Sequence, residues 1–192
     1  MTNRINARNR YVFAAVFAAL IAVSSFLIIP VPGIPIPIVL KNLFIVLSGT
    51  ILGGFYGGFS LLIFILAGLA GIPVFVIPGG IGVFATPLGG YIIGYFLAAL
   101  ISGVICGLPK TSEKKVNPFF LLRLIFASLT GFILILMSGV IYMMFLNSIS
   151  FTAAMTAGFA PFIIADAIKL VISIPLALKL RPIAARYINS QE

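Results

Sequence analysis

Long apolar stretches fill most of the 192-residue chain, and short segments that are polar or rich in glycine and proline separate them. A helix that crosses a bilayer needs about 20 consecutive apolar residues, and a shorter one needs tilt or shelter among its neighbours. The pattern therefore predicts an all-α integral membrane protein, a single transmembrane domain over residues 1–192 with six transmembrane helices. We place the spans at about 11–30, 39–52, 59–70, 88–105, 118–145 and 158–178.

The segments between these spans differ in charge. With six spans, the arginine-rich start, the lysine-containing linker at 108–117 and the basic tail fall on one face, whereas the loops 31–38, 71–87 and 146–157 on the other face contain no ionisable group. Lys and Arg are enriched on the cytoplasmic side, so both termini are expected to be cytoplasmic. The apolar Gly/Pro segment 71–87 must be buried in protein or line a cavity, because its amides cannot be satisfied by lipid.

Composition agrees with a membrane protein and narrows the function. Hydrophobic residues make up 62% of the chain and charged residues 8%, against roughly a quarter charged in soluble domains. The net charge of +9 comes largely from terminal and linker cations, which favours a topology signal over nucleic-acid binding. Histidine is absent, and no phosphate-binding loop or nucleophile elbow occurs, so we expect no enzyme, cofactor or metal site. Any pumping energy must come from a partner or a gradient.

Three ionisable residues lie away from the predicted cytoplasmic segments: Asp166, Lys169 and Lys41. Asp166 and Lys169 are three residues apart and share one helix face, and the topology places both level with Lys41 in the outer half of the bundle. Charges at membrane depth are costly and usually functional. Their net positive charge suits a ligand carboxylate or polarised carbonyl. The alternatives are an Asp–Lys pair that only locks helices together and a Lys41 that reaches the outer headgroups.

Small and aromatic residues offer weaker indications. Ala14, Ala18 and Ala22 form one ridge of the first span, which favours packing within the bundle and docking onto another membrane protein equally. Phe75 and Tyr91 have rings that can stack on a ring-shaped ligand.

Three segments resemble the BioY family, the biotin-binding S component of energy-coupling factor (ECF) transporters. They read PIPIVLKNL (35–43), GLAGIPVFVIPGGIGVFATPLGGYIIGYFLAA (68–99) and PFIIADAIKLVISIPLALKLRP (161–182). The resemblance implies a six-helix S-component bundle, an outward-facing pocket under the loops, and a complex with a transmembrane scaffold subunit and two ATPase subunits, which would hydrolyse ATP. It also implies that Asp166 and Lys169 hold polar groups of biotin and that the alanine ridge meets the scaffold subunit.

The chain departs from the family pattern at two places on the presumed pocket rim. Where the family usually has Thr-Leu-Gln-Thr, this sequence has Val-Leu-Lys-Asn at 39–42, which introduces Lys41 and Asn42. Where the family usually has Pro-Thr-Gly-Gly-Tyr, this sequence has Pro-Leu-Gly-Gly-Tyr at 87–91. Lys41 can meet a ligand carboxylate in a way that a glutamine would not.

The resulting hypothesis is a subunit of the prokaryotic cytoplasmic membrane that binds biotin. Asp166 would accept hydrogen bonds from ureido N–H groups, and Lys169, with or without Lys41, would meet the ureido oxygen or the carboxylate. The loop at 74–82 would cover the bicyclic ring, with Gly79 and Gly80 allowing close approach. The alternatives are an S component for another small vitamin and a structural membrane subunit that transports nothing.

Overall fold

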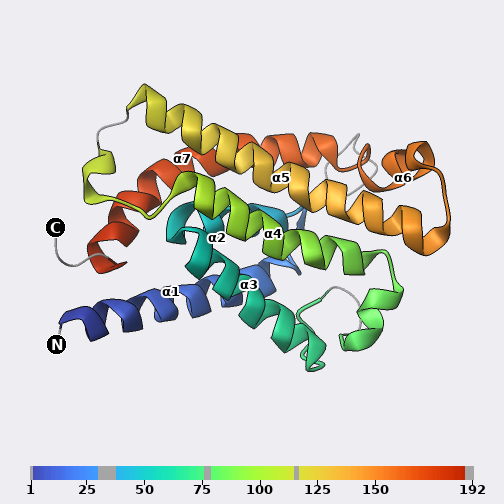
Figure 1. Ribbon diagram of the computed structural model, residues 1–192, viewed down its shortest axis with the longest axis horizontal. Coiled ribbons are helices and arrows are strands. Elements are labelled where there is room, and N and C mark those ends of the chain that lie inside the picture. The colour runs from blue at the N-terminus through green and yellow to red at the C-terminus, as the bar shows by residue number, and fades with distance from the viewer. Residues whose placement is uncertain (1, 30–37, 76–78, 115–116, 189–192) are drawn as a thin grey trace.

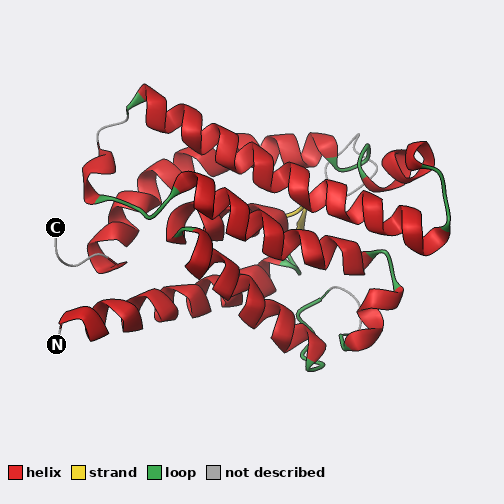
Figure 2. Ribbon diagram, in the orientation of Figure 1, coloured by secondary structure: helices red, strands yellow, loops and turns green. Residues whose placement is uncertain are grey.

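A computed structural model describes residues 2–29, 38–75, 79–114 and 117–188, and over these residues the chain is a helical bundle (Figures 1 and 2). The longer helices run lengthwise, and shorter ones lie obliquely between them (Figure 1). In chain order the elements are α1 (Thr2–Ser24), β1 (Ile28–Ile29), β2 (Ile38–Val39), α2 (Lys41–Leu52), α3 (Gly54–Leu69), the 3₁₀ turn η1 (Ile81–Ala85), α4 (Leu88–Cys106), the 3₁₀ turn η2 (Thr111–Lys114), α5 (Pro118–Asn147), α6 (Phe151–Gly158) and α7 (Ile163–Ile188).

A small antiparallel hairpin joins α1 to α2. Ile28 pairs with Val39 and Ile29 pairs with Ile38, so the start of α2 is held beside the end of α1. The hairpin is the yellow element in Figure 2. The proline-rich loop predicted at 31–38 lies outside the described residues except for Ile38, which is in β2.

The helices extend beyond the predicted spans where polar residues flank an apolar run. α1 begins at Thr2 and α7 continues to Ile188, because a helix needs no lipid around its polar turns. α5 begins with a capping side chain, since Asn117 accepts a hydrogen bond from the backbone N–H of Phe119 at 3.0 Å. It ends at Ser148, whose φ of 50° is left-handed and stops the helix.

Two predicted connections have more helix than expected. The uncharged segment 146–157, predicted as a loop, contains most of α6, which begins where the Ser150 hydroxyl accepts from the Ala153 N–H at 3.3 Å. The connection expected at 53–58, between the second and third predicted spans, is reduced to Gly53, with φ 82°. Gly57 belongs to α3, and a Cβ there would lie 2.6 Å from the Cα of Gly49, so the glycine lets α3 pack closely on α2.

Gly90, Gly94, Ala98 and Ser102 recur every four residues, a spacing that predicts close helix contact, and α4 packs tightly in the structure. A Cβ on Gly94 would lie 3.1 Å from the Cα of Ile135, and one on Gly90 would lie 2.8 Å from the Ser138 carbonyl oxygen. Both glycines therefore allow α5 to approach the backbone of α4, as the spacing predicts.

The two ends of the bundle differ. The start of α1 and the end of α7 meet at one end (Figure 1), where the Asn9 amide donates to the Tyr187 carbonyl at 3.0 Å. α6 and η1 lie at the other end (Figure 1). Within the described residues, α4 and α5 are each long and apolar enough to cross a membrane, and α6 with α7, bent by 57°, qualifies as one broken span.

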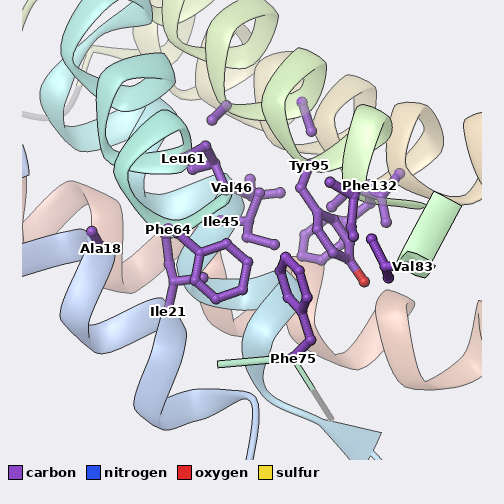
Figure 3. Close-up of a cluster of buried hydrophobic side chains, with 14 residues drawn as sticks. Ala18, Ile21, Ile45, Val46, Leu61, Phe64, Phe75, Val83, Tyr95 and Phe132 are labelled. Carbon is purple, nitrogen blue, oxygen red and sulfur yellow. The ribbon is translucent and has the colours of Figure 1, made fainter. Parts of the chain in front are cut away.

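Buried apolar side chains form two clusters along the bundle. One contains Ile45, Phe64 and Tyr95 and gathers side chains from α1 to α5 (Figure 3). The other lies toward the terminal end and contains Leu47, Ile51 and Ala177. The candidate site borders the first cluster.

Candidate functional site

The central feature is a buried ion pair at the start of α7. The Nζ atom of Lys169 lies 2.6 Å from Oδ1 of Asp166, and each residue is 3% exposed. The two residues are three positions apart on one helix, so their side chains meet on the same helix face. Because both charges are withdrawn from water, the pair persists only while its remaining donors and acceptors find partners.

A third side chain reaches this pair from α2. The Asn42 amide nitrogen lies 3.3 Å from Oδ2 and 3.4 Å from Oδ1 of Asp166. These distances are long for N–H···O hydrogen bonds, whose usual range ends near 3.2 Å. The Lys169 ammonium therefore engages Oδ1 strongly, while Oδ2 keeps the capacity to accept a better donor.

Lys41, the first residue of α2, is buried nearby and has no carboxylate partner among the described residues. It is 4% exposed, and its Nζ lies 4.7 Å from the centroid of the Tyr95 ring. A cation over an aromatic face is stabilised by the ring quadrupole, though less completely than by a counter-ion. The Tyr95 ring is a site residue that the sequence analysis missed; its spacing of four residues from Tyr91 on one helix was the available signal.

These residues surround a cavity of about 170 Å³. Its wall is mostly apolar and includes both lysines and Asn42, whereas Asp166 lies one layer behind and touches two of the lining side chains. The described lining residues are Val39, Lys41, Asn42, Leu88, Tyr91, Tyr95, Leu136, Phe162, Ala165 and Lys169. An apolar cavity with a few convergent polar groups is the usual form of a small-molecule site.

Tyr91 lines this cavity and is also hydrogen-bonded to the end of α6. Its hydroxyl donates to the Gly158 carbonyl at 2.6 Å, at the end of α6. Its ring meets Phe162 edge-on, with centroids 6.3 Å apart. The polar end of the tyrosine is thus already used by the protein, which leaves its ring to face the cavity.

Phe75, Gly79 and Gly80 do not line the cavity. Phe75 is 2% exposed and packs edge-on against Phe64, with ring centroids 5.5 Å apart (Figure 3). The Gly80 N–H donates to the Gly68 carbonyl at 2.8 Å, and a Cβ on Gly79 would lie 2.4 Å from the same oxygen. This part of the predicted lid is anchored on α3 because its aromatic ring is buried in the core; residues 76–78 lie outside the described part.

The alanine ridge of α1 faces inward. Ala14 is 0% and Ala18 5% exposed, and Ala22 is half-buried, so packing within the bundle accounts for them. The small residues that α1 exposes are Ala15 and Ala19.

A second ion pair, between the buried Arg181 and the partly exposed Glu113, lies at the terminal end, and sequence reasoning missed it. Arg181 is 0% exposed, and its guanidinium forms a two-pronged bond with Glu113, at 2.8 Å and 3.0 Å. The same group donates to the carbonyls of Thr50, Gly107 and Leu108, at the ends of α2 and α4. The sequence analysis had treated Arg181 as one cation of a basic tail, and nothing local separates it from its neighbours there.

No group of three histidine, cysteine, aspartate or glutamate side chains comes together within the ranges that the structure describes. The polar groups of the cavity are ammonium, carboxylate, amide and phenol. Such groups bind a ligand by hydrogen bonds and charge.

Comparisons with known proteins give a consistent result. The BioY family model matches residues 1–186. The chain is 34% identical to the biotin transporter BioY of Thermotoga maritima, over 88% of this chain and 93% of that protein. It is 37% identical to the probable biotin transporter BioY of Lysinibacillus sphaericus, over 88% of this chain and 85% of that one. Its fold matches a crystal structure of the S-component for biotin from an ECF-type ABC transporter, with a TM-score of 0.75, 29% identity and 94% of each chain covered.

Proposed function

Because the chain belongs to the BioY family, we propose that it is the substrate-binding membrane subunit for biotin uptake. It captures biotin outside the cell and delivers it through an ATP-driven ECF complex. The observation that carries this proposal is the buried Asp166–Lys169 pair directly behind and beside an apolar cavity. Biotin combines an apolar bicyclic ring with one ureido group. This matches a mostly apolar cavity whose polar groups gather at the Asp166–Lys169 pair.

The ureido group would meet both members of the pair. Its oxygen is an acceptor that suits the free N–H donors of the Lys169 ammonium, and its N–H groups suit Oδ2 of Asp166. The long Asn42 contact at 3.3 Å is the one that a ligand N–H would replace. Tyr91, Tyr95 and Phe162 would enclose the ring.

For the membrane arrangement, we propose six crossings with both termini in the cytoplasm. This chain is a multi-pass prokaryotic membrane protein, and its described cations other than the site lysines gather toward the end where α1 begins and α7 finishes. At the opposite end, the described elements η1 and α6 contain no Asp, Glu, Lys or Arg. A cytoplasmic excess of Lys and Arg supports this orientation, which leaves the cavity facing outward.

For the complex, we propose a scaffold subunit in the membrane and two ATPase subunits that bind and hydrolyse ATP. The exposed face of α1, with Ala15 and Ala19 among apolar neighbours, fits close contact with another helix. Ala19→Trp should abolish co-purification with the scaffold subunit while biotin binding persists. Unchanged co-purification would remove this face from the interface.

Mass spectrometry of small molecules released from the purified, unheated protein tests the proposal. Biotin should be recovered in near-stoichiometric amount from wild type and in much lower amount from Asp166→Asn. Recovery of a different vitamin would assign the chain to another ligand of the same fold, which is possible because a fold does not fix its ligand. Recovery of no ligand, together with no biotin binding by calorimetry, would support a structural subunit.

A further inference from the structure

Lys41 is the one cation at the cavity that the protein leaves without a counter-ion among the described residues. Its ammonium has three N–H donors, and its recorded contact is the face of Tyr95 at 4.7 Å. Lys169, by contrast, is neutralised by Asp166 at 2.6 Å. Asp166 is the single carboxylate near the cavity in the described chain, since the other described one, Glu113, lies at the far end with Arg181.

The charge around the cavity therefore sums to one positive unit. The wall contributed by α4 and α5 carries tyrosine phenols and Leu136, and the β2 residue Val39 is apolar, so none of the described lining groups offsets Lys41. Lys41 is also the first residue of α2, where the helix dipole adds positive potential. Both features favour an anion.

Such a lysine is poorly explained as a stabilising group. Removing an ammonium from water is costly, and the cation–π attraction to Tyr95 offsets only part of that cost. The remaining cost is offset only when an anionic group enters the cavity. A ligand carboxylate supplies that charge and accepts the free N–H donors in a short, charge-assisted bond.

Resting on the proposed function, we propose that Lys41 is the specificity-determining residue that binds the ligand's carboxylate. The ligand then lies with its ureido end at the Asp166–Lys169 pair and its acid end at Lys41. In consequence, the protein selects a free carboxylic acid and rejects neutral esters of the same molecule.

Calorimetry with biotin and biotin methyl ester tests this assignment, using the full chain in detergent or nanodiscs. Wild type should bind the acid at least tenfold more tightly than the ester. Lys41→Met should bind the acid about as weakly as wild type binds the ester, with its ester affinity unchanged within about twofold. Lys169→Met is the matched control, and it should weaken both compounds by the same factor.

The melting temperature of the ligand-free protein gives a second readout. Lys41→Met should melt at or above the wild-type temperature, because it removes an uncompensated charge. Lys41→Gln, which keeps polar donors without the charge, should show the same loss of acid preference and serves if the Met variant does not fold. A persistent preference for the acid in either variant would overturn the assignment, as would equal loss of acid and ester binding. Failure of wild type to bind either compound would instead refute the proposed function.

Discussion

Within the described residues the bundle holds two ion pairs, each with a buried cation, and they differ in how fully the protein satisfies them. Arg181 has more acceptors around it than its five N–H donors require: both Glu113 oxygens, carbonyls from the ends of α2 and α4, and the Cys106 sulfur. The Asp166–Lys169 pair has one strong internal bond and one long contact from Asn42, and an unneutralised Lys41 lies close by.

The difference separates a structural ion pair from one suited to recognition. A saturated pair has no donor or acceptor to offer, so it contributes by joining segments that are far apart in sequence. An unsaturated pair beside a cavity is costly in the empty protein and is completed by a ligand. Saturation of the hydrogen bonds is therefore a better guide to function here than burial, since the cations of both pairs, Lys169 and Arg181, are buried.

Replacing Arg181 with Met should cause the largest effect. It would leave Glu113 unpaired and several helix-end carbonyls without donors, so the free energy of unfolding should fall by about 3–5 kcal/mol. Thermal unfolding followed by circular dichroism measures this loss. Arg186→Met, an exposed change on the same helix, should alter stability by less than about 0.5 kcal/mol. Full stability in Arg181→Met would show that the Arg181–Glu113 pair is not a structural pair and would remove the contrast with Asp166–Lys169.

Asp166→Asn should have the converse effect, reducing binding more than stability. Loss of the carboxylate removes the charge that orients Lys169 and the acceptor for ligand N–H groups. Biotin affinity should fall at least tenfold, or about 1.4 kcal/mol, by calorimetry. Glu113→Gln is the matched carboxylate change at the other end, and its folded fraction should bind biotin as wild type does. Unchanged affinity in Asp166→Asn would end the ligand role of this carboxylate.

Tyr91→Phe should give the smallest effect, and it separates the role of the Tyr91 hydroxyl from that of its ring. It removes the bond to the Gly158 carbonyl but keeps the ring against the cavity. Stability should fall by about 1 kcal/mol, with biotin dissociating a few-fold faster because α6 is less firmly held. Stopped-flow displacement of bound biotin measures the rate. Tyr142→Phe, which removes a comparable bond to the Phe84 carbonyl away from the lining, should leave the rate unchanged.

Much of the site could be predicted from the sequence because charges are so scarce in the apolar runs. Asp166, Lys169 and Lys41 each stand out in an apolar stretch, and the topology was enough to bring them together. Asn42, which the family resemblance placed at the presumed rim, and Tyr91, named for its ring, both line this cavity. The family resemblance added an expected ligand to this arrangement.

What could not be predicted depends on three-dimensional neighbours rather than on local pattern. Arg181 lies in a basic tail, and its role arises from α2, α4 and η2, which are distant in the chain. Phe75 looked like part of a lid because its loop is rich in glycine and proline, yet the large apolar ring gains more by packing against Phe64. The alanine ridge of α1 fitted both packing within the bundle and docking onto another protein. Only the structure shows that Ala14 and Ala18 face inward while Ala15 and Ala19 are exposed.

The bond network of Arg181 also orders the assembly of the protein in time. Domains and helices emerge from the ribosome N-terminal part first, and Arg181 belongs to the last helix to be made. Until α7 is inserted, the carbonyls of Thr50, Gly107 and Leu108 lack the donor that they share in the finished bundle. A chain that stalls or is cleaved before residue 181 therefore keeps these three carbonyls without their Arg181 donor, and only the completed α7 supplies it.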